Sequence, residues 1–113
     1  MAIGSTPGDC LAACVIDPTT DTLFARSFGV GTLTINAAGK DYSIALTNQA
    51  QANEAFVFVS ATLQGQAGSP LVAPVVSSSG PGTWNVQLID ATGALAAGTA
   101  PLHLVWFRSA AGL

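Results

Sequence analysis

Residues 54–63 constrain the fold most strongly, because they are apolar on both sides of an extended chain. They read Glu-Ala-Phe-Val-Phe-Val-Ser-Ala-Thr-Leu, and aromatic and β-branched residues of this kind are enriched in strands. Side chains alternate between the two faces of a strand, so Phe56 and Phe58 share one face and the two valines share the other. Other parts of the chain must then pack on both faces. The stretch is therefore predicted to be a central, buried strand of a β-sandwich.

Period-two alternation elsewhere in the chain predicts further strands, most of them with one buried face. Residues 101–108 carry large apolar side chains on both faces and should form a second interior strand. Residues 10–16 are compatible with a short strand. The clearest one-sided segments are residues 41–47, with Tyr42, Ile44 and Leu46 on one face, and residues 84–88, with Trp84, Val86 and Leu88 on one face.

Glycine and proline divide these strands. Gly29 and Gly31 interrupt residues 23–35, which predicts two short strands or one strand with a bulge. Residues 36–39 read as a tight hairpin turn that ends in a glycine with positive φ. Pro70 and Pro74 confine any strand at residues 70–76 to a sheet edge. Further turns or loops are expected at residues 17–21, 48–53, 77–82, 90–93 and 94–100.

The length of 113 residues allows one domain with one modest core. We predict an all-β fold, a single antiparallel β-sandwich of jelly-roll or immunoglobulin-like type over residues 23–113. Residues 1–22 are expected to be a short N-terminal arm, because they are rich in turn formers and lack a strong period. A loose similarity between residues 39–59 and 82–107 suggests either an internal duplication or two similar hairpin units, one in each part of the sandwich.

Charged side chains are unusually few. The chain has three basic and six acidic residues, half of its residues are hydrophobic, and residues 55–89 contain no charge at all. A soluble domain ordinarily has about a quarter charged residues. We infer that copies of the chain, or a larger assembly, cover much of its surface.

The same composition excludes several partners. The net charge of −3 and the lack of a basic cluster argue against nucleic acid and against an anionic membrane surface. Polar, glycine and proline residues interrupt the uncharged span well before the roughly 18 continuous apolar residues that a membrane helix needs.

Cys10 and Cys14 are the only cysteines. Residues 11–14 look like a lipoprotein cleavage box, but no basic or long apolar segment precedes them. A disulfide between the two would close a very small loop, and two thiols are only half of a structural zinc site. The favoured interpretation is two small apolar residues in an N-terminal segment.

No residue pattern supports catalysis, and we predict no catalytic, cofactor-binding or metal-binding residue. His103, the single histidine, lies among large apolar residues and is expected to be a buried or interface histidine held by one hydrogen bond. Asp17 and Asp21 lack the alternating ligands of a calcium loop and favour an Asx-type turn. Tyr42, Trp84 and Trp106 could stack on a sugar, but each falls on the apolar face of its strand and is expected in the core.

One segment also carries a family resemblance. Gly29-Val30 leads into a short strand, Gly39 lies in the following turn, and an aromatic, a β-branched and a large apolar residue then occupy alternate positions from Tyr42. This order resembles the opening of small β-sandwich modules at the ends of bacteriophage tail fibres and of bacterial collagen-like proteins. The apolar residues 56–59 and the pair Trp106-Phe107 follow in the same order, so the resemblance covers about residues 26–108.

The resemblance implies a non-enzymatic, usually trimeric module on a particle or cell surface. The chain starts at its own methionine with a short arm and no fibre shaft, which is more typical of a free-standing piece added to a capsid or tail. The first hypothesis is therefore a virion-surface structural protein, a homotrimer that decorates or cements a phage capsid or tail and contacts its proteins. The alternative is an adhesion module of a tail fibre that binds a host-surface glycan through loops such as residues 77–82 or 94–100. A secreted enzyme is the weakest hypothesis.

Overall fold

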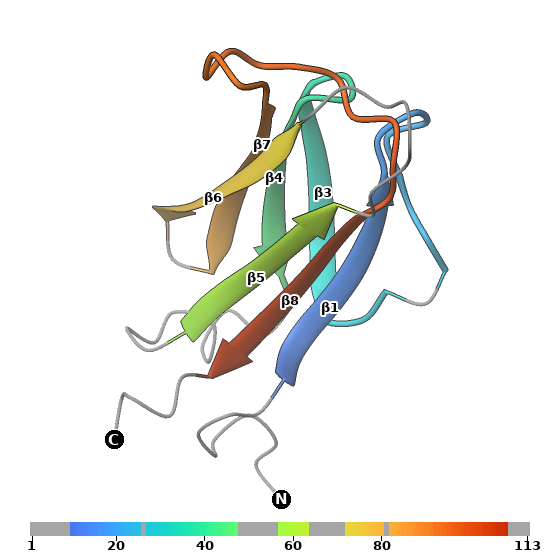
Figure 1. Ribbon diagram of the computed structural model, residues 1–113. Helices are drawn as coiled ribbons and strands as arrows, with labels where there is room; N and C mark the ends of the chain where they lie inside the picture. The colour runs from blue at the N-terminus through green and yellow to red at the C-terminus, as the bar shows by residue number, and fades with distance from the viewer. Residues whose placement is uncertain (1–9, 26, 48–56, 64–71, 81, 109–113) are drawn as a thin grey trace, which may run out of the picture.

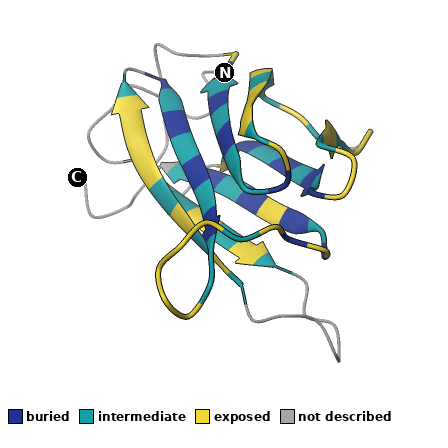
Figure 2. Cartoon of the chain, turned by 90° about the horizontal axis from the view of Figure 1, so that it is seen from above, coloured by how far each residue is buried: buried dark blue, intermediate teal, exposed yellow. Residues whose placement is uncertain are grey.

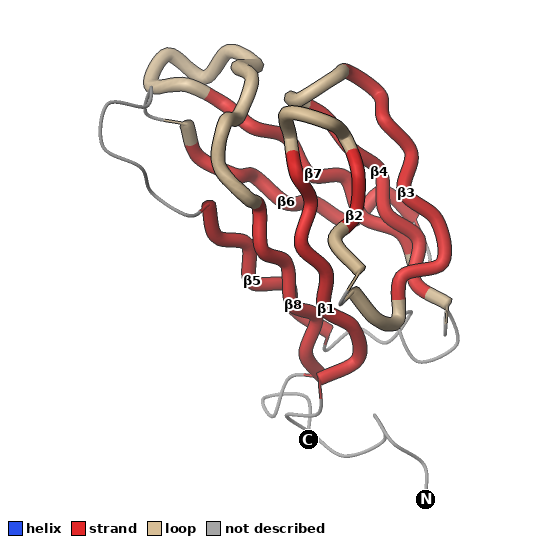
Figure 3. Tube along the Cα trace, turned by 90° about the vertical axis from the view of Figure 1, so that its right-hand side faces the viewer, coloured by secondary structure: helices blue, strands red, loops and turns tan. Residues whose placement is uncertain are grey.

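The computed structural model describes residues 10–25, 27–47, 57–63, 72–80 and 82–108. In this part of the chain all regular structure is strand, joined by turns and loops (Figure 3). The strands are β1 (Cys10–Asp17), β2 (Thr22–Leu23), β3 (Val30–Ala37), β4 (Asp41–Leu46), β5 (Val57–Leu63), β6 (Ala73–Gly80), β7 (Thr83–Ile89) and β8 (Leu102–Arg108).

The strands form two four-stranded antiparallel sheets packed as a sandwich, as the sequence predicts. One sheet has the order β2-β1-β8-β5 and the other the order β3-β4-β7-β6. Figure 1 shows the two layers, with β5, β8 and β1 in front of β4, β3 and β7. The chain crosses between the sheets after β2, β4, β5 and β7, so each sheet is built from segments separated by strands of the other.

The core lies between the sheets and is built from alternate residues of the inner strands. Figure 2 shows buried and partly exposed residues alternating along these strands. Wholly apolar contacts fill the space, because no polar or charged residue is buried in the described part of the chain. The buried cluster consists of Ala12, Cys14, Ile16, Tyr42, Ile44, Leu46, Trp84, Val86, Leu88, Leu102, Leu104 and Trp106.

The prediction of a central strand at residues 54–63 is wrong in its position. β5 pairs only with β8 and therefore stands at the edge of its sheet. Ser60 and Thr62 are exposed, while Val59 and Ala61 pack against the core from the other face. These two hydroxyl residues already break the apolar pattern, and a strand with one polar face suits an edge. Residues 54–56 lie outside the described residues.

The interior positions of that sheet belong to β8, as predicted, and to β1, which was expected in the arm. β1 pairs with β8 and buries Ala12, Cys14 and Ile16. The boundary at residue 22 is therefore wrong for β1, which is part of the sandwich. The short strand expected at residues 10–16 is present, but its place inside the sandwich was not predicted, because alanine and cysteine give only a weak apolar period. Residues 1–9 lie outside the described residues.

Most of the expected turns and edges are confirmed. The β3–β4 pairing shifts register between Val30 and Thr32, which is the predicted bulge, and Gly39 has φ +71° in the hairpin turn. β6 is an edge strand that includes Pro74. One loop is wrong: Ser77 to Gly80 continue β6 because they pair with β7. The expected loop at residues 48–53 lies outside the described residues.

The loose sequence similarity has a structural counterpart. β3, β4 and β5 are arranged like β6, β7 and β8, each unit being a hairpin followed by a strand in the opposite sheet. At the junction of the units Tyr42 pairs with Val86, and Ile44 pairs with Trp84. Tyr42 corresponds to Trp84 and Ile44 to Val86, so the two pairs are equivalent under exchange of the units. The two hairpins share a single sheet, which corrects the expectation of one hairpin in each part of the sandwich.

Hydrogen bonds tie three turns together at one end of the sandwich. Asp21 Oδ1 accepts bonds from the Tyr42 hydroxyl at 2.7 Å and from the Gly39 N–H at 2.8 Å. The Gly98 N–H donates to the Gly39 carbonyl at 3.0 Å. Burial, and then the neighbouring Asp21, raise the pKa of Tyr42, so the phenol stays a hydrogen-bond donor. The turns after β1 and β3 and the loop after β7 are thereby fixed to each other.

Candidate functional site

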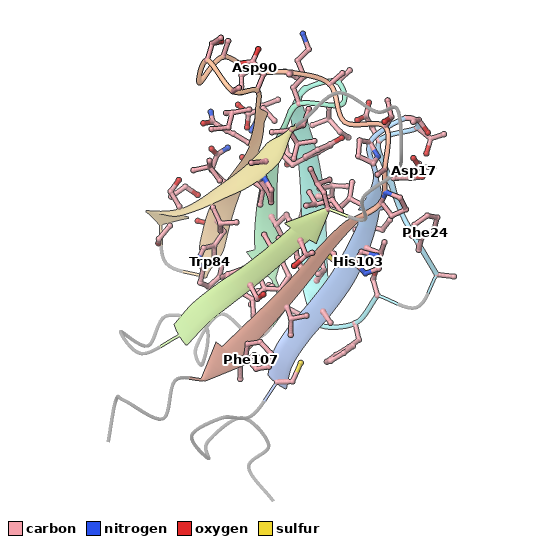
Figure 4. All side chains as sticks on the ribbon, in the orientation of Figure 1. Asp17, Phe24, Trp84, Asp90, His103 and Phe107 are labelled. Carbon is pink, nitrogen blue, oxygen red and sulfur yellow. The ribbon has the colours of Figure 1, made fainter. Side chains whose placement is uncertain are left out.

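The most unusual surface of the molecule is the solvent-facing side of the β2-β1-β8-β5 sheet. Its apolar side chains alternate with the buried ones along β1 and β8, and two phenylalanines from the segment after β2 extend it. Figure 4 labels Phe24, His103 and Phe107 over this sheet. We call this surface the outer apolar face and define it as Ala13, Val15, Phe24, Phe28, Val105 and Phe107.

Strand pairing explains why these residues share one face. Ala13 lies opposite Val105 on β8, and on its other side it pairs with Phe28 through two backbone hydrogen bonds of 3.0 and 2.8 Å. The Phe24 N–H donates to the Val15 carbonyl at 2.9 Å. Paired residues point to the same side of a sheet, so both phenylalanines join the row. Phe24 and Phe28 are 43% and 52% exposed.

Charge is scarce on this surface. Among the described residues of β1 and β8, only Asp17 at the end of β1 adds a carboxylate to the outer side, and its side chain bonds to Thr19 in the adjoining turn. His103 lies on the outer side between Val15 and Thr62 and is exposed. The expectation that His103 could be buried is wrong, because its strand phase is opposite to that of buried Leu102 and Leu104. Its place in an interface stays a prediction.

The outer side of the other sheet is polar. Its centre is the Asp41 carboxylate, whose Oδ1 accepts a bond from Asn85 Nδ2 at 2.7 Å and whose Oδ2 accepts one from Gln87 Nε2 at 3.2 Å. Asn36 Nδ2 donates to Asp41 Oδ1 at 3.3 Å and to the Ser43 hydroxyl at 2.8 Å. We call these five residues the polar face. They join β3, β4 and β7 by side-chain bonds in addition to the backbone ladder.

The environment of Asp41 favours its charged form. Burial by itself raises the pKa of this carboxyl, but the bonds from Asn85, Gln87 and Asn36 lower it more, so the net pKa lies below its usual range. Hydrogen bonds to the ionised form stabilise it. Three amide groups thus direct N–H donors at one carboxylate, and the arrangement offers no nucleophile and base pair for catalysis within these five residues.

The aromatic residues considered for sugar stacking belong to the core, as predicted. Tyr42, Trp84 and Trp106 are buried, and the two indole rings meet edge to face at a centroid distance of 6.1 Å. Such contacts are typical of packed aromatics. Trp106 Nε1 is buried and finds no acceptor among the described residues.

The two cysteines lie on opposite faces of β1. Cys14 is buried in the core, and burial raises the pKa of its thiol to about 12. Cys10 is exposed, lies opposite Phe107, and its Sγ is 3.6 Å from the Ala12 carbonyl oxygen. Both thiols are free, and the interpretation as a small apolar residue fits the buried Cys14 but not the exposed Cys10.

Asp17 forms the predicted Asx turn, since its Oδ1 accepts bonds from the Thr19 N–H at 3.0 Å and hydroxyl at 2.6 Å. Asp90 forms the same turn with Thr92 at the same end of the sandwich (Figure 4). Within the described ranges no three His, Cys, Asp or Glu side chains gather as a metal site. Those ranges also hold no helix of a length and hydropathy suited to crossing a membrane.

Sequence reasoning missed both outer faces. The polar face joins residues far apart in the chain, and nothing in the sequence signals that Asn36 and Asn85 approach the same carboxylate. The outer apolar face had a partial signal, because Val15, Val105 and Phe107 occupy the second apolar phase of their strands. Phe24 and Phe28 joined it only through the pairing of their segment with β1.

Comparison with known proteins adds no relative. No protein-family model, no curated protein and no solved structure matches this chain.

Proposed function

We propose that this chain is a non-enzymatic structural protein of a bacteriophage virion, a homo-oligomeric β-sandwich that decorates or cements the capsid or tail surface. The observation that carries the proposal is the outer apolar face. Isolated exposed apolar residues are normal, but a contiguous row across β1, β8 and the segment after β2 is typical of an interaction surface. The resemblance to tail-fibre modules, which are usually trimeric, favours three copies.

Burying a phenylalanine side chain stabilises by roughly 1.5–3 kcal/mol, and Phe24 and Phe28 each still expose about half of their surface. Covering both in an interface should therefore gain on the order of 1 kcal/mol for each ring. The six residues that define the outer apolar face carry no charge, so covering them removes no charged group of their own from water.

Self-association is tested with the double variant Phe24→Ser, Phe28→Ser. Light scattering at tens of micromolar should show an oligomer for the native protein and a smaller species for the variant. Leu95→Ser is the matched control, because Leu95 is 41% exposed but lies in the loop between β7 and β8, away from this sheet. A monodisperse native monomer, or an unchanged mass for the double variant, would contradict the proposal.

The virion assignment needs its own test. Flanking genes for portal, capsid or fibre proteins would support it, and the protein should then be detected in purified particles at a fixed ratio to the capsid protein. If it is absent from particles made by the same genome, the structural role in the virion is wrong even where the protein is oligomeric.

Binding of a host-surface glycan is the second candidate, and the polar face favours it. Amide and carboxylate groups held in fixed positions can bind neighbouring sugar hydroxyls in pairs. A glycan array with the native protein and with Asn85→Ala tests this role. Asn85→Ala also removes bonds to Asp41 and to the Tyr42 carbonyl and should lower the melting temperature, so binding is measured well below it. Binding lost in the folded variant supports the role, whereas no binding to any glycan of the host surface removes this candidate.

A further inference from the structure

The four sheet edges of the sandwich differ in how they are protected. An unpaired edge strand invites pairing with another chain, and proteins ordinarily block it with prolines, charges, short strands or covering elements. β2 has only two residues, and β6 contains Pro74. β5 lies beside β6 (Figure 1). β3 is the fourth edge, with eight residues and neither proline nor charge.

The composition of β3 favours pairing. Val30, Thr32, Thr34 and Ile35 are β-branched, and residues 32, 34, 35 and 36 are exposed. Ile35 is 44% exposed although it pairs with buried Tyr42 and so belongs to the inner side of the sheet. An apolar side chain in this position would be covered if the sheet continued past β3.

Backbone directions show which groups of β3 face outward. The Leu46 N–H donates to the Gly82 carbonyl on the β7 side, and residues of a strand direct their N–H and C=O groups alternately to either neighbour. Ser43 and Ala45 therefore face β3, where they pair with Thr34 and Thr32. It follows that Leu33 and Ile35 direct their N–H and C=O groups to the open edge.

We propose that β3 pairs with β3 of a second copy of the chain, antiparallel about a twofold axis through Thr34. Leu33 of one copy then lies opposite Ile35 of the other, and each such pair exchanges two backbone hydrogen bonds. Both side chains lie on the inner side, so Ile35 gains an apolar neighbour that already packs against the core. Thr34 meets Thr34 on the outer side, and no like charges face each other.

The bulges of β3 limit the length of this contact. They fall between Val30 and Thr32 and between Ile35 and Ala37, which leaves Thr32 to Ile35 in regular register. The second copy is the fitting occupant because this segment is complementary to itself in register, polarity and charge. This contact adds a second interface to the proposed self-association, and it rests on that proposal only because both require copies of the chain to associate. The β3 edge lies on a different side of the molecule from the outer apolar face.

The first test places a charge at this edge. Ile35→Lys introduces an inward-pointing lysine of the kind that protects natural edges, and Val75→Lys is the matched control, since Val75 is also 44% exposed on an edge strand of the same sheet. Sedimentation should show that Ile35→Lys raises the dissociation constant of the pair about tenfold or more, with Val75→Lys unchanged. An equal effect of both variants, or of neither, overturns the proposal.

The second test needs no variant. In the native protein the amide protons of Leu33 and Ile35 should exchange more slowly as concentration rises, because they become bonded only in the pair. The amide of Ser78 is the internal control. Ser78 pairs with Trp84, whose backbone N–H and C=O groups are directed to β4, so the Ser78 N–H also faces an open sheet edge. Its exchange rate should not change with concentration. Rapid, concentration-independent exchange at Leu33 and Ile35 overturns the proposal.

The two interfaces are separable. The Phe24→Ser, Phe28→Ser variant should keep slow exchange at Leu33 and Ile35 and form a dimer, whereas Ile35→Lys should keep the oligomer held by the outer apolar face. If the native protein forms no oligomer through the outer apolar face but Leu33 and Ile35 exchange slowly, the β3 pairing is supported and the proposed function is contradicted. If it forms that oligomer but both amides exchange rapidly, the proposed function is supported and the β3 pairing is contradicted.

Discussion

Two side chains, the buried Trp106 and the half-buried Asp41, show how single residues contribute to the stability of the fold. Trp106 is fully buried between the sheets and contacts Trp84, yet its Nε1 finds no acceptor among the described residues. Its contribution is therefore that of a large apolar side chain, reduced by an unsatisfied donor.

We expect Trp106→Ala to lower the free energy of unfolding by about 3–5 kcal/mol through lost burial and a cavity. Trp106→Phe should cost clearly less, because it keeps most of the packing and removes the unsatisfied N–H. Thermal unfolding of both variants measures the difference. Equal losses would mean that the indole N–H has a partner in the folded protein.

Asp41 predicts a dependence of stability on pH. Its folded pKa lies below the usual value of about 3.9, so it contributes stability that is complete above about pH 4 and lost as pH falls through the folded pKa. Hydrogen bonds in their turns lower the pKa of Asp17 and Asp90 in the same direction.

Asp41→Asn should therefore be less stable than the native protein at pH 7 and lose less stability between pH 4 and pH 2. Urea unfolding at several pH values measures both slopes. The loss should be reduced rather than abolished, because the other two aspartates remain. Identical acid profiles for the two proteins would refute the role of the amide bonds.

At the scale of elements, the connection from β2 to β3 depends on a close approach. Gly29 has φ +76°, and a Cβ there would lie 2.7 Å from Ala12 Cβ and 2.8 Å from the Leu11 carbonyl oxygen. Gly93 has a similar φ of +86° in the turn after β7, but a Cβ there would meet no atom within 4 Å.

The two glycines therefore form a matched pair. Gly93→Ala should cost about 1–2 kcal/mol for the left-handed conformation alone. Gly29→Ala should cost about 1–3 kcal/mol more, because the added methyl group forces β1 and the β2–β3 connection apart. The difference between the melting temperatures of the two variants measures the cost of the close contact at Gly29. Equal decreases in melting temperature would show that the β2–β3 connection moves to accommodate the methyl group at little cost.

At the scale of the whole molecule, the two sides of the sandwich have opposite character. One sheet presents the outer apolar face and the other presents the polar face, and the turns at Asp17 and Asp90 lie at one end of the sandwich. A molecule of this kind can bury one side in an assembly and keep the other in water.

Assembly through the outer apolar face should accordingly be insensitive to screening. Salt weakens contacts between charges, whereas excluded salts such as sulfate strengthen apolar burial. Light scattering should show the oligomer retained in about 1 M sodium chloride, well beyond physiological screening, and enhanced in sulfate. Dissociation in sodium chloride would indicate an interface held by charge.

The sequence alone determined the fold class and most of the strands, because alternation of large apolar residues such as Tyr42, Ile44 and Leu46 specifies both a strand and its buried face. It also located the core tryptophans and the turn at Gly39, since these depend on local chemistry. Only the tertiary structure decided that β5 stands at an edge and β1 in the interior, because neighbours in a sheet are chosen by long-range pairing, which leaves no local period. The same reason applies to both outer faces: Phe28 meets Ala13, and Asn85 meets Asp41, only after the chain has crossed between the sheets.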